Sequence, residues 1–109
     1  MIVQYRAKDI NLNDVNKAHI EAAVEKFEKY SLDITRIMCN VIAEKAGVSV
    51  EFEIHVARTA PIIITEHDKD LDAAIDIAID RATKALRRLH DKVKDHKAPS
   101  LKEVVIEDA

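Results

Sequence analysis

The stretch that decides the fold is EHDKDLDAAIDIAIDRATKALRRLHDKVK, residues Glu66 to Lys94. Its apolar residues recur every three or four positions, so they share one face of a helix. They are Leu71, Ile75, Ala78, Ala82, Leu86, Leu89 and Val93. Because such a helix has to bury its apolar stripe, the sequence predicts a second layer of structure beneath it.

Charges in this segment are sorted by sign. Acids come first, namely Asp68, Asp70, Asp72, Asp76 and Asp80; bases follow, namely Arg81, Lys84, Arg87, Arg88, Lys92 and Lys94. The helix macrodipole favours this order, but it acts only over the first and last turn, and the basic run begins earlier. At about 100° per residue, four bases fall on one flank of the apolar stripe: Arg81, Lys84, Arg88 and Lys92. This flank, the basic ridge, is a candidate phosphate-binding surface.

Composition limits the possible classes of protein. A chain of 109 residues is long enough for one domain with a single core. The formal net charge is −3, so affinity for nucleic acid would have to come from segregated charge. A single cysteine, Cys39, excludes an internal disulfide and is expected to be a small buried hydrophobe. No apolar run has the length of a signal peptide or a membrane span, so we expect a cytoplasmic protein.

The N-terminal half predicts a strand and a helix. Val3, Tyr5 and Ala7 alternate with polar residues, which is typical of a half-buried strand. Asn11 or Asn13 can cap the helix that follows. Its inner face is expected to carry Ile20, Val24, Phe27 and Tyr30.

Three further strands are predicted before the last helix. Residues Ile34 to Ala43 and Val48 to Val56 both alternate in polarity, and Gly47 is expected in the turn between them. Pro61 is expected to start the fourth strand, PIIITEH, because proline is tolerated at strand beginnings.

This order predicts an α+β fold, a β-α-β-β-β-α two-layer sandwich. Both helices would pack on one face of a four-stranded mixed sheet, and the other face would meet water. A right-handed crossover through the first helix would make the first two strands parallel, and the remaining strands would form antiparallel hairpins. We expect a domain over residues 1–97 and an acidic, flexible C-terminal tail over residues 98–109.

Two segments resemble a known family. DLDAAIDIAIDRATKALRRLHDKVK, beginning at Asp70, and HIEAAVEKFEKY, beginning at His19, are similar to the second and first helices of the short ribosome hibernation factors. These are also known as the sigma-54 modulation protein family. The resemblance extends from Ile2 to about Lys94 and implies the same β-α-β-β-β-α fold.

The resemblance also implies a function. Bacterial members of this family bind the small ribosomal subunit at the decoding centre during stress. Their two-helix side occupies the path of the messenger and of the A- and P-site tRNAs, which silences or stores idle ribosomes. The partners implied are small-subunit rRNA and ribosomal proteins. No catalytic activity, cofactor, metal, small-molecule substrate or membrane is implied, and the free protein is expected to be a monomer.

The positions that match the family's bases, together with the neighbouring Lys29 and Arg87, give an expected RNA-binding set of eight bases. They are Lys17, Lys26, Lys29, Arg81, Lys84, Arg87, Arg88 and Lys92. The chain departs from the family's usual residues at Asn16, Ala23, Asp72 and Ala85. The acidic tail resembles that of the inhibitory members of the family, which oppose ribosome pairing, and we expect inhibitor-like behaviour.

The sequence also allows other hypotheses about function. The chain could be a protein-interaction module of the sigma-factor-modulating type, acting through Met38 and Ile42 on the open sheet face or through the tail. His55 and His67 lie on adjacent predicted strands and could approach one another, but no third ligand accompanies them and no metal site is expected. Nucleophile constellations, glycine-rich loops and paired carboxylates do not occur in the sequence, so no enzyme is expected.

Overall fold

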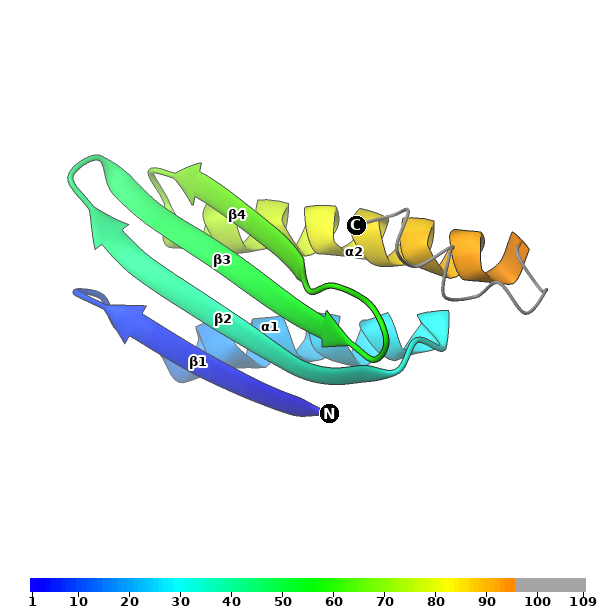
Figure 1. Cartoon of the computed structure of the whole chain (residues 1–109). Coiled ribbons are helices and arrows are strands. Elements are labelled where there is room, and N and C mark those ends of the chain that lie inside the picture. Colours follow the sequence, from blue (N-terminus) through cyan, green and yellow to red (C-terminus); the bar gives the residue numbers. More distant parts are fainter. Residues whose placement is uncertain (96–109) are drawn as a thin grey trace.

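A four-stranded sheet with two helices on one face forms the part of the chain that our computed structural model describes, residues 1–95 (Figure 1). The elements are β1 (Ile2–Lys8), α1 (Asp14–Phe27), the 3-10 turn η1 (Glu28–Tyr30), β2 (Ile34–Glu44), β3 (Gly47–Val56), β4 (Ile62–Asp68) and α2 (Leu71–Asp95). The predicted α+β two-layer fold is confirmed. The predicted domain boundary at residue 97 and the tail after it lie outside the described residues.

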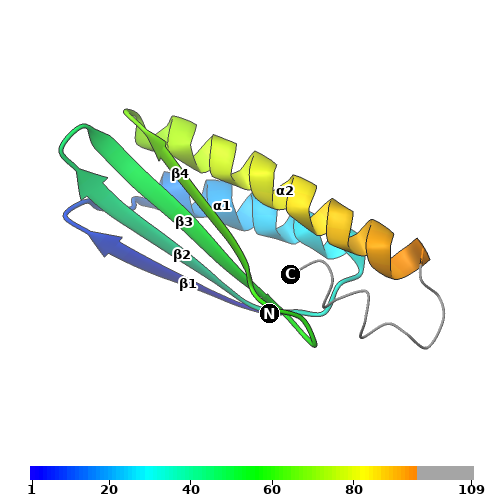
Figure 2. The same ribbon diagram turned by 45° about the horizontal axis from the view of Figure 1, so that its top comes forward.

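The strands lie in the order β1-β2-β3-β4. β1 is parallel to β2, as predicted, and the other two pairs are antiparallel. β1, β2 and β4 therefore run in the same direction. Since α1 follows β1 and α2 follows β4, both helices start at the same end of the strands and run back in parallel (Figure 2).

Two predicted boundaries were wrong by one residue. Gly47 is the first residue of β3, and the turn consists of residues 45–46. Pro61 directly precedes β4, whose first residue is Ile62. The last helix begins at Leu71, whereas Asp68 ends β4. Asp70 caps this helix: its carboxylate accepts the N–H of Ala73 at 3.0 Å.

The N-terminus of α1 is fixed by a reciprocal pair of asparagines. Asn13 accepts the backbone N–H of Asn16 at 2.8 Å, and Asn16 accepts that of Asn13 at 3.2 Å. Of the two predicted caps, Asn13 is therefore the one used. Asn16 is buried, and its amide also donates to Asp72 on α2 at 3.0 Å. A buried polar side chain thus ties the start of α1 to α2 at little desolvation cost.

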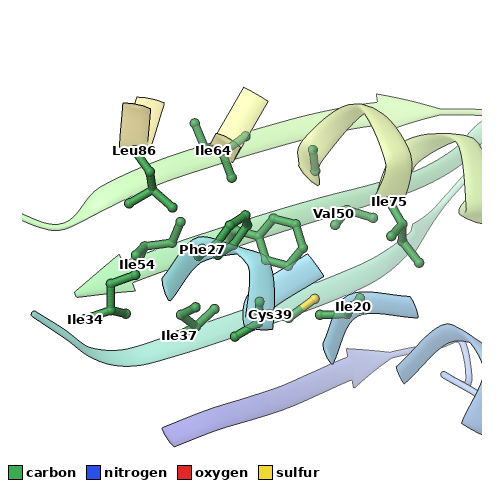
Figure 3. Packing of buried hydrophobic residues seen from close by; sticks show 14 of the residues in the cluster. Ile20, Phe27, Ile34, Ile37, Cys39, Val50, Ile54, Ile64, Ile75 and Leu86 are labelled. Atoms are coloured by element: carbon green, nitrogen blue, oxygen red, sulfur yellow. The ribbon is translucent and has the colours of Figure 1, made fainter. Parts of the chain in front are cut away.

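The core lies between the helices and the sheet (Figure 3). Ile20 and Phe27 enter it from α1, and Ile75 and Leu86 enter it from α2. The apolar stripe of α2 is fully buried at Ile75, Ala78, Ala82 and Leu86, as predicted. Three small residues on the buried side of α2, Ala74, Ala78 and Ala82, allow the helix to approach the strands closely.

The burial of Ala82 gives a stability prediction. Ala82→Lys should destabilise the fold more than Leu86→Ala, which should cost about 2–5 kcal/mol through cavity formation. The lysine charge would be forced into the contact between α2 and the sheet, where no water can solvate it. Urea denaturation measures both losses, with Ala18→Lys on the exposed face of α1 as the matched control. An unchanged midpoint for Ala82→Lys would contradict the observed orientation of α2.

Gly47 gives a second stability prediction. Its φ is +147°, and a Cβ added there would lie 2.3 Å from the carbonyl oxygen of Asp68. Because the obstacle is backbone, the β2–β3 turn or the β4–α2 connection would have to move. Gly47→Ala should therefore cost more than about 1 kcal/mol in the free energy of unfolding. Ala46→Gly, one residue earlier in the exposed turn, is the control and should change the urea midpoint little.

Candidate nucleic-acid interface

α1 and α2 contact one another along their length in parallel register. His19 Nε2 lies 2.6 Å from Asp76 Oδ1, one turn beyond the contact between Asn16 and Asp72. At the other end, the rings of Tyr30 and His90 lie 6.0 Å apart. The C-terminal ends of both helices therefore lie at the same end of the helix layer, as Figure 2 shows.

A shallow groove of about 300 Å³ lies between these helices. Lys26 and Lys29 line it from the first helix and the 3-10 turn, while Asp76 and Asp80 line it from α2. The groove thus has a basic wall and an acidic wall. The basic ridge of α2 lies on the opposite flank of that helix, so the predicted bases do not line one common groove.

Lys17 lies apart from the other predicted bases. Its ammonium is 5.6 Å from the centre of the Tyr5 ring on β1, and the Tyr5 hydroxyl donates to Glu21 at 2.9 Å. Burial and the bond to Glu21 raise the pKa of Tyr5 well above its usual range. Lys17 therefore packs on the outer flank of α1 against β1, where it helps to hold that helix to the edge strand.

Arg81 is engaged with the other edge strand. Its guanidinium donates to the carbonyl oxygen of Thr65 at 3.1 Å and forms an ion pair with Glu66. Since β4 is an edge strand, this contact places Arg81 against the outer side of the sheet's edge. The charge of Arg81 is thus partly neutralised by its own fold, which makes this residue a structural contact between α2 and β4.

The remaining bases gather at one end of the helix layer. Because the helices are parallel, Lys26 and Lys29 lie level with the middle of α2, where Asp80 and Thr83 line the same groove. We call the exposed bases of this region the basic end: Lys26, Lys29, Lys84, Arg87 and Arg88. Lys92, which is half-buried, belongs to the same end of α2. The structure thus groups most of the predicted set, although Lys17 and Arg81 fall outside it.

Acids accompany the bases of the basic end: Asp91, whose side chain is 64% exposed, follows Arg87 by four residues on α2 and shares its side of the helix. Asp80 pairs with Lys84 at 3.1 Å, but both side chains are more than half exposed, so this contact is weak and easily exchanged. Glu25 and Glu28 follow Glu21 at intervals of four and three residues and share its flank, away from α2. Lys26 and Lys29 therefore face the groove, and the glutamates face away from it.

The open face of the sheet is mainly polar. Glu51 accepts from Asn40 at 3.2 Å and from Thr65 at 3.4 Å, which forms a row across β2, β3 and β4. Met38 is half-buried, and Ile42 is 42% exposed beside Ser49 of β3. The other exposed large apolar side chains of the strands are Ile2 and Ile63, 59% and 57% exposed, on the edge strands β1 and β4.

The two strand histidines do not meet. His67 pairs in register with Ser49, which is six residues from His55 along β3, or about 20 Å at strand spacing. His55 contacts Glu53 and Arg36, each at 3.3 Å. Within residues 1–95, no group of three or more His, Cys, Asp and Glu side chains is placed to hold a metal ion.

Cys39 is fully buried, as predicted. Burial raises the pKa of its thiol to about 12, so the reactive thiolate is strongly disfavoured in the folded state. This agrees with a role as a small core residue.

These features define a class: a two-layer α+β protein whose parallel helices carry a basic end. The chain matches the family model described as "Sigma 54 modulation protein / S30EA ribosomal protein" over residues 3–94 and belongs to that family of ribosome-associated factors. The resemblance seen in the sequence is therefore confirmed. No curated protein matches the sequence.

Two solved structures share this fold. One is described as a ribosomal subunit interface protein from Coxiella burnetii, with a TM-score of 0.75 and 13% identity; the match covers 84% of this chain and 100% of that one. The other is the N-terminal domain of Protein Y from Thermus thermophilus, with a TM-score of 0.65 and 20% identity; the match covers 80% of this chain and 93% of that one. In residues 1–95, neither helix has the length and apolarity to cross a membrane.

The contacts of Arg81 predict that its contribution is structural. Arg81→Ala should lower the free energy of unfolding by about 0.5–1 kcal/mol, because an edge carbonyl and Glu66 both lose a donor. Arg87→Ala removes the same charge from an exposed position of α2 and should change stability by less than half of that. Urea denaturation of the two variants measures the difference. Equal stabilities would show that the contact with β4 contributes nothing.

Proposed function

We propose that this protein binds the small ribosomal subunit at the decoding centre with its helix layer. There it blocks the path of the messenger and of the A- and P-site tRNAs, and so silences or stores idle ribosomes in the cytoplasm. Membership of a family of ribosome-associated factors supports association with the ribosome. The observation that carries the finer proposal is the collection of five exposed bases at one end of the helix layer.

The chemistry of the basic end suits a phosphate backbone. Arg87, Arg88 and Lys84 extend from the exposed sides of α2, and Lys26 and Lys29 extend into the adjoining groove. Charge-assisted hydrogen bonds from such side chains to phosphate oxygens are stronger than neutral ones.

Base stacking should add little to this binding. Of the four aromatic side chains, Phe27, Phe52 and Tyr30 are buried, and Tyr5 bonds to Glu21 beside β1. We therefore expect recognition through phosphates and RNA shape, with the strong salt dependence that accompanies release of counterions.

A protein-interaction function is the alternative, because the family description also covers modulation of sigma 54. That function would use the open sheet face or the tail. The row of hydrogen bonds through Glu51 makes this face polar, which favours the helix layer as the binding surface. Salt distinguishes the two functions: phosphate binding weakens by a log–log slope of about −0.7 to −0.9 per neutralised phosphate, whereas an apolar protein contact responds little.

The proposal predicts the effect of removing the bases of α2. Replacing Lys84, Arg87 and Arg88 by Ala should weaken binding to isolated small subunits by about 3 kcal/mol, on the order of a hundredfold. The slope of log affinity against log salt should become shallower by about 2 to 3, because roughly one phosphate contact is lost with each base. Sedimentation with small subunits over a range of salt concentrations measures both quantities.

A matched control removes the same charge from the other end of the molecule. Three exposed lysines lie at the end of the strands from which both helices start: Lys8, Lys45 and Lys69. Their replacement by Ala changes the net charge equally and should leave most of the binding intact. Equal losses in the two triple variants, with unchanged circular dichroism, would contradict the proposed surface.

A further inference from the structure

A second cleft lies beside the basic end, on the flank of α2 away from the groove. It measures about 220 Å³ and is closed on one side by the β3–β4 loop and on the other by α2. Its lining is apolar at Pro61, Ile62, Ala85 and Leu89, and Arg88 lies at its rim. For comparison, a cavity of about 150 Å³ can hold a benzene ring. The cleft therefore has room for branched aliphatic side chains.

One arginine lines this cleft, and a second is adjacent to its lining in the sequence. Besides Arg88, Arg58 directly precedes Thr59, which lines the cleft, and Arg58 is exposed with a φ of +66°. An apolar lining that includes Arg88 and adjoins Arg58 in the β3–β4 loop suits a short segment that has aliphatic side chains at its centre and carboxylates beside them.

The sequence of this chain contains such a segment. Residues 103–108 read EVVIED: Val104, Val105 and Ile106 are adjacent, Glu103 precedes them, and Glu107 and Asp108 follow. We infer that Val104 to Ile106 occupy the cleft between α2 and the β3–β4 loop of the same molecule, with the flanking carboxylates against Arg58 and Arg88.

The chain is long enough for this contact. α2 ends at Asp95, and Leu89 lies six residues earlier, or about 9 Å along the helix. The nine steps from Asp95 to Val104 span up to about 30 Å, which allows the chain to turn back. Because a short tether raises the effective concentration to about the millimolar range, even a weak contact would be well populated.

This contact bears on the proposed function, and this part of the inference rests on it. Arg88 belongs to the basic end, so a tail carboxylate beside it would compete with RNA phosphate for the same guanidinium. The tail would then act as an internal competitor that RNA has to displace. Its removal should strengthen RNA binding by about three- to tenfold, because one or two exposed ion pairs would no longer oppose it.

Docking itself is tested without RNA. Amide and methyl NMR spectra are compared between the full chain, a chain ending at Lys97, and a full chain carrying Val104→Ser, Val105→Ser and Ile106→Ser. The inference predicts that signals of Ile62, Ala85 and Leu89 shift together in both altered chains. Signals of Ile42 and Ile63, on the open sheet face, should not move. Ser100→Ala in the tail is the control substitution and should also leave the cleft signals unchanged.

Unchanged cleft signals in the truncated chain would overturn the inference. Shifts that grow with protein concentration would also overturn it, because the occupant would then be the tail of a second copy. Binding to small subunits separates this result from the proposed function. If neither the full nor the truncated chain binds, the proposed function fails, whereas docking is still decided by the spectra.

Discussion

The contact between α2 and the sheet is the constraint on which the rest of the structure depends. Ala78 and Ala82 are fully buried, so the helix lies close to the strands and cannot rotate without exposing its apolar stripe. That fixed rotation decides what each flank meets. Arg81 meets the edge strand β4, Asp76 meets α1, and Arg87 is left to solvent. The distribution of charge over the surface is therefore a consequence of core packing.

The shared direction of β1 and β4 is a second constraint, because it fixes how the two helices lie relative to one another. Because β1 and β4 run in the same direction, α1 and α2 both begin at one end of the strands and both finish at the other end. Each helix alone carries only a few bases, but their parallel arrangement brings Lys26 and Lys29 level with the middle of α2, where its run of bases begins. An antiparallel helix pair with the same sequences would separate these charges by the length of a helix. The topology thus produces a local positive region on a protein whose net charge is −3.

The fold could be predicted because its signals are periodic. Alternation in β2 and β3 and the helical stripe of α2 fixed which side chains enter the core. The separation of Lys17 from the other bases could have been predicted in the same way. Lys17 and Lys26 are nine residues apart, which is about 900° on a helix, so they lie on opposite sides of α1. The contacts of Arg81 with Thr65 and Glu66 could not have been found from periodicity, because they join different elements and depend on the edge position of β4.

The capping of both helix N-termini limits the kind of phosphate binding that the basic end can support. Helix N-termini are the usual sites for phosphate, because their free N–H groups and the macrodipole attract anions. Here both N-termini are already occupied by the chain's own side chains, Asn13 and Asp70, and Asp14 and Asp72 follow in the first turns. The bases lie instead at the C-terminal ends, where the macrodipole offers phosphate no help. Any attraction must come from long, exposed side chains that reach beyond the helices. Such contacts adapt to the shape of a backbone and weaken strongly as salt rises.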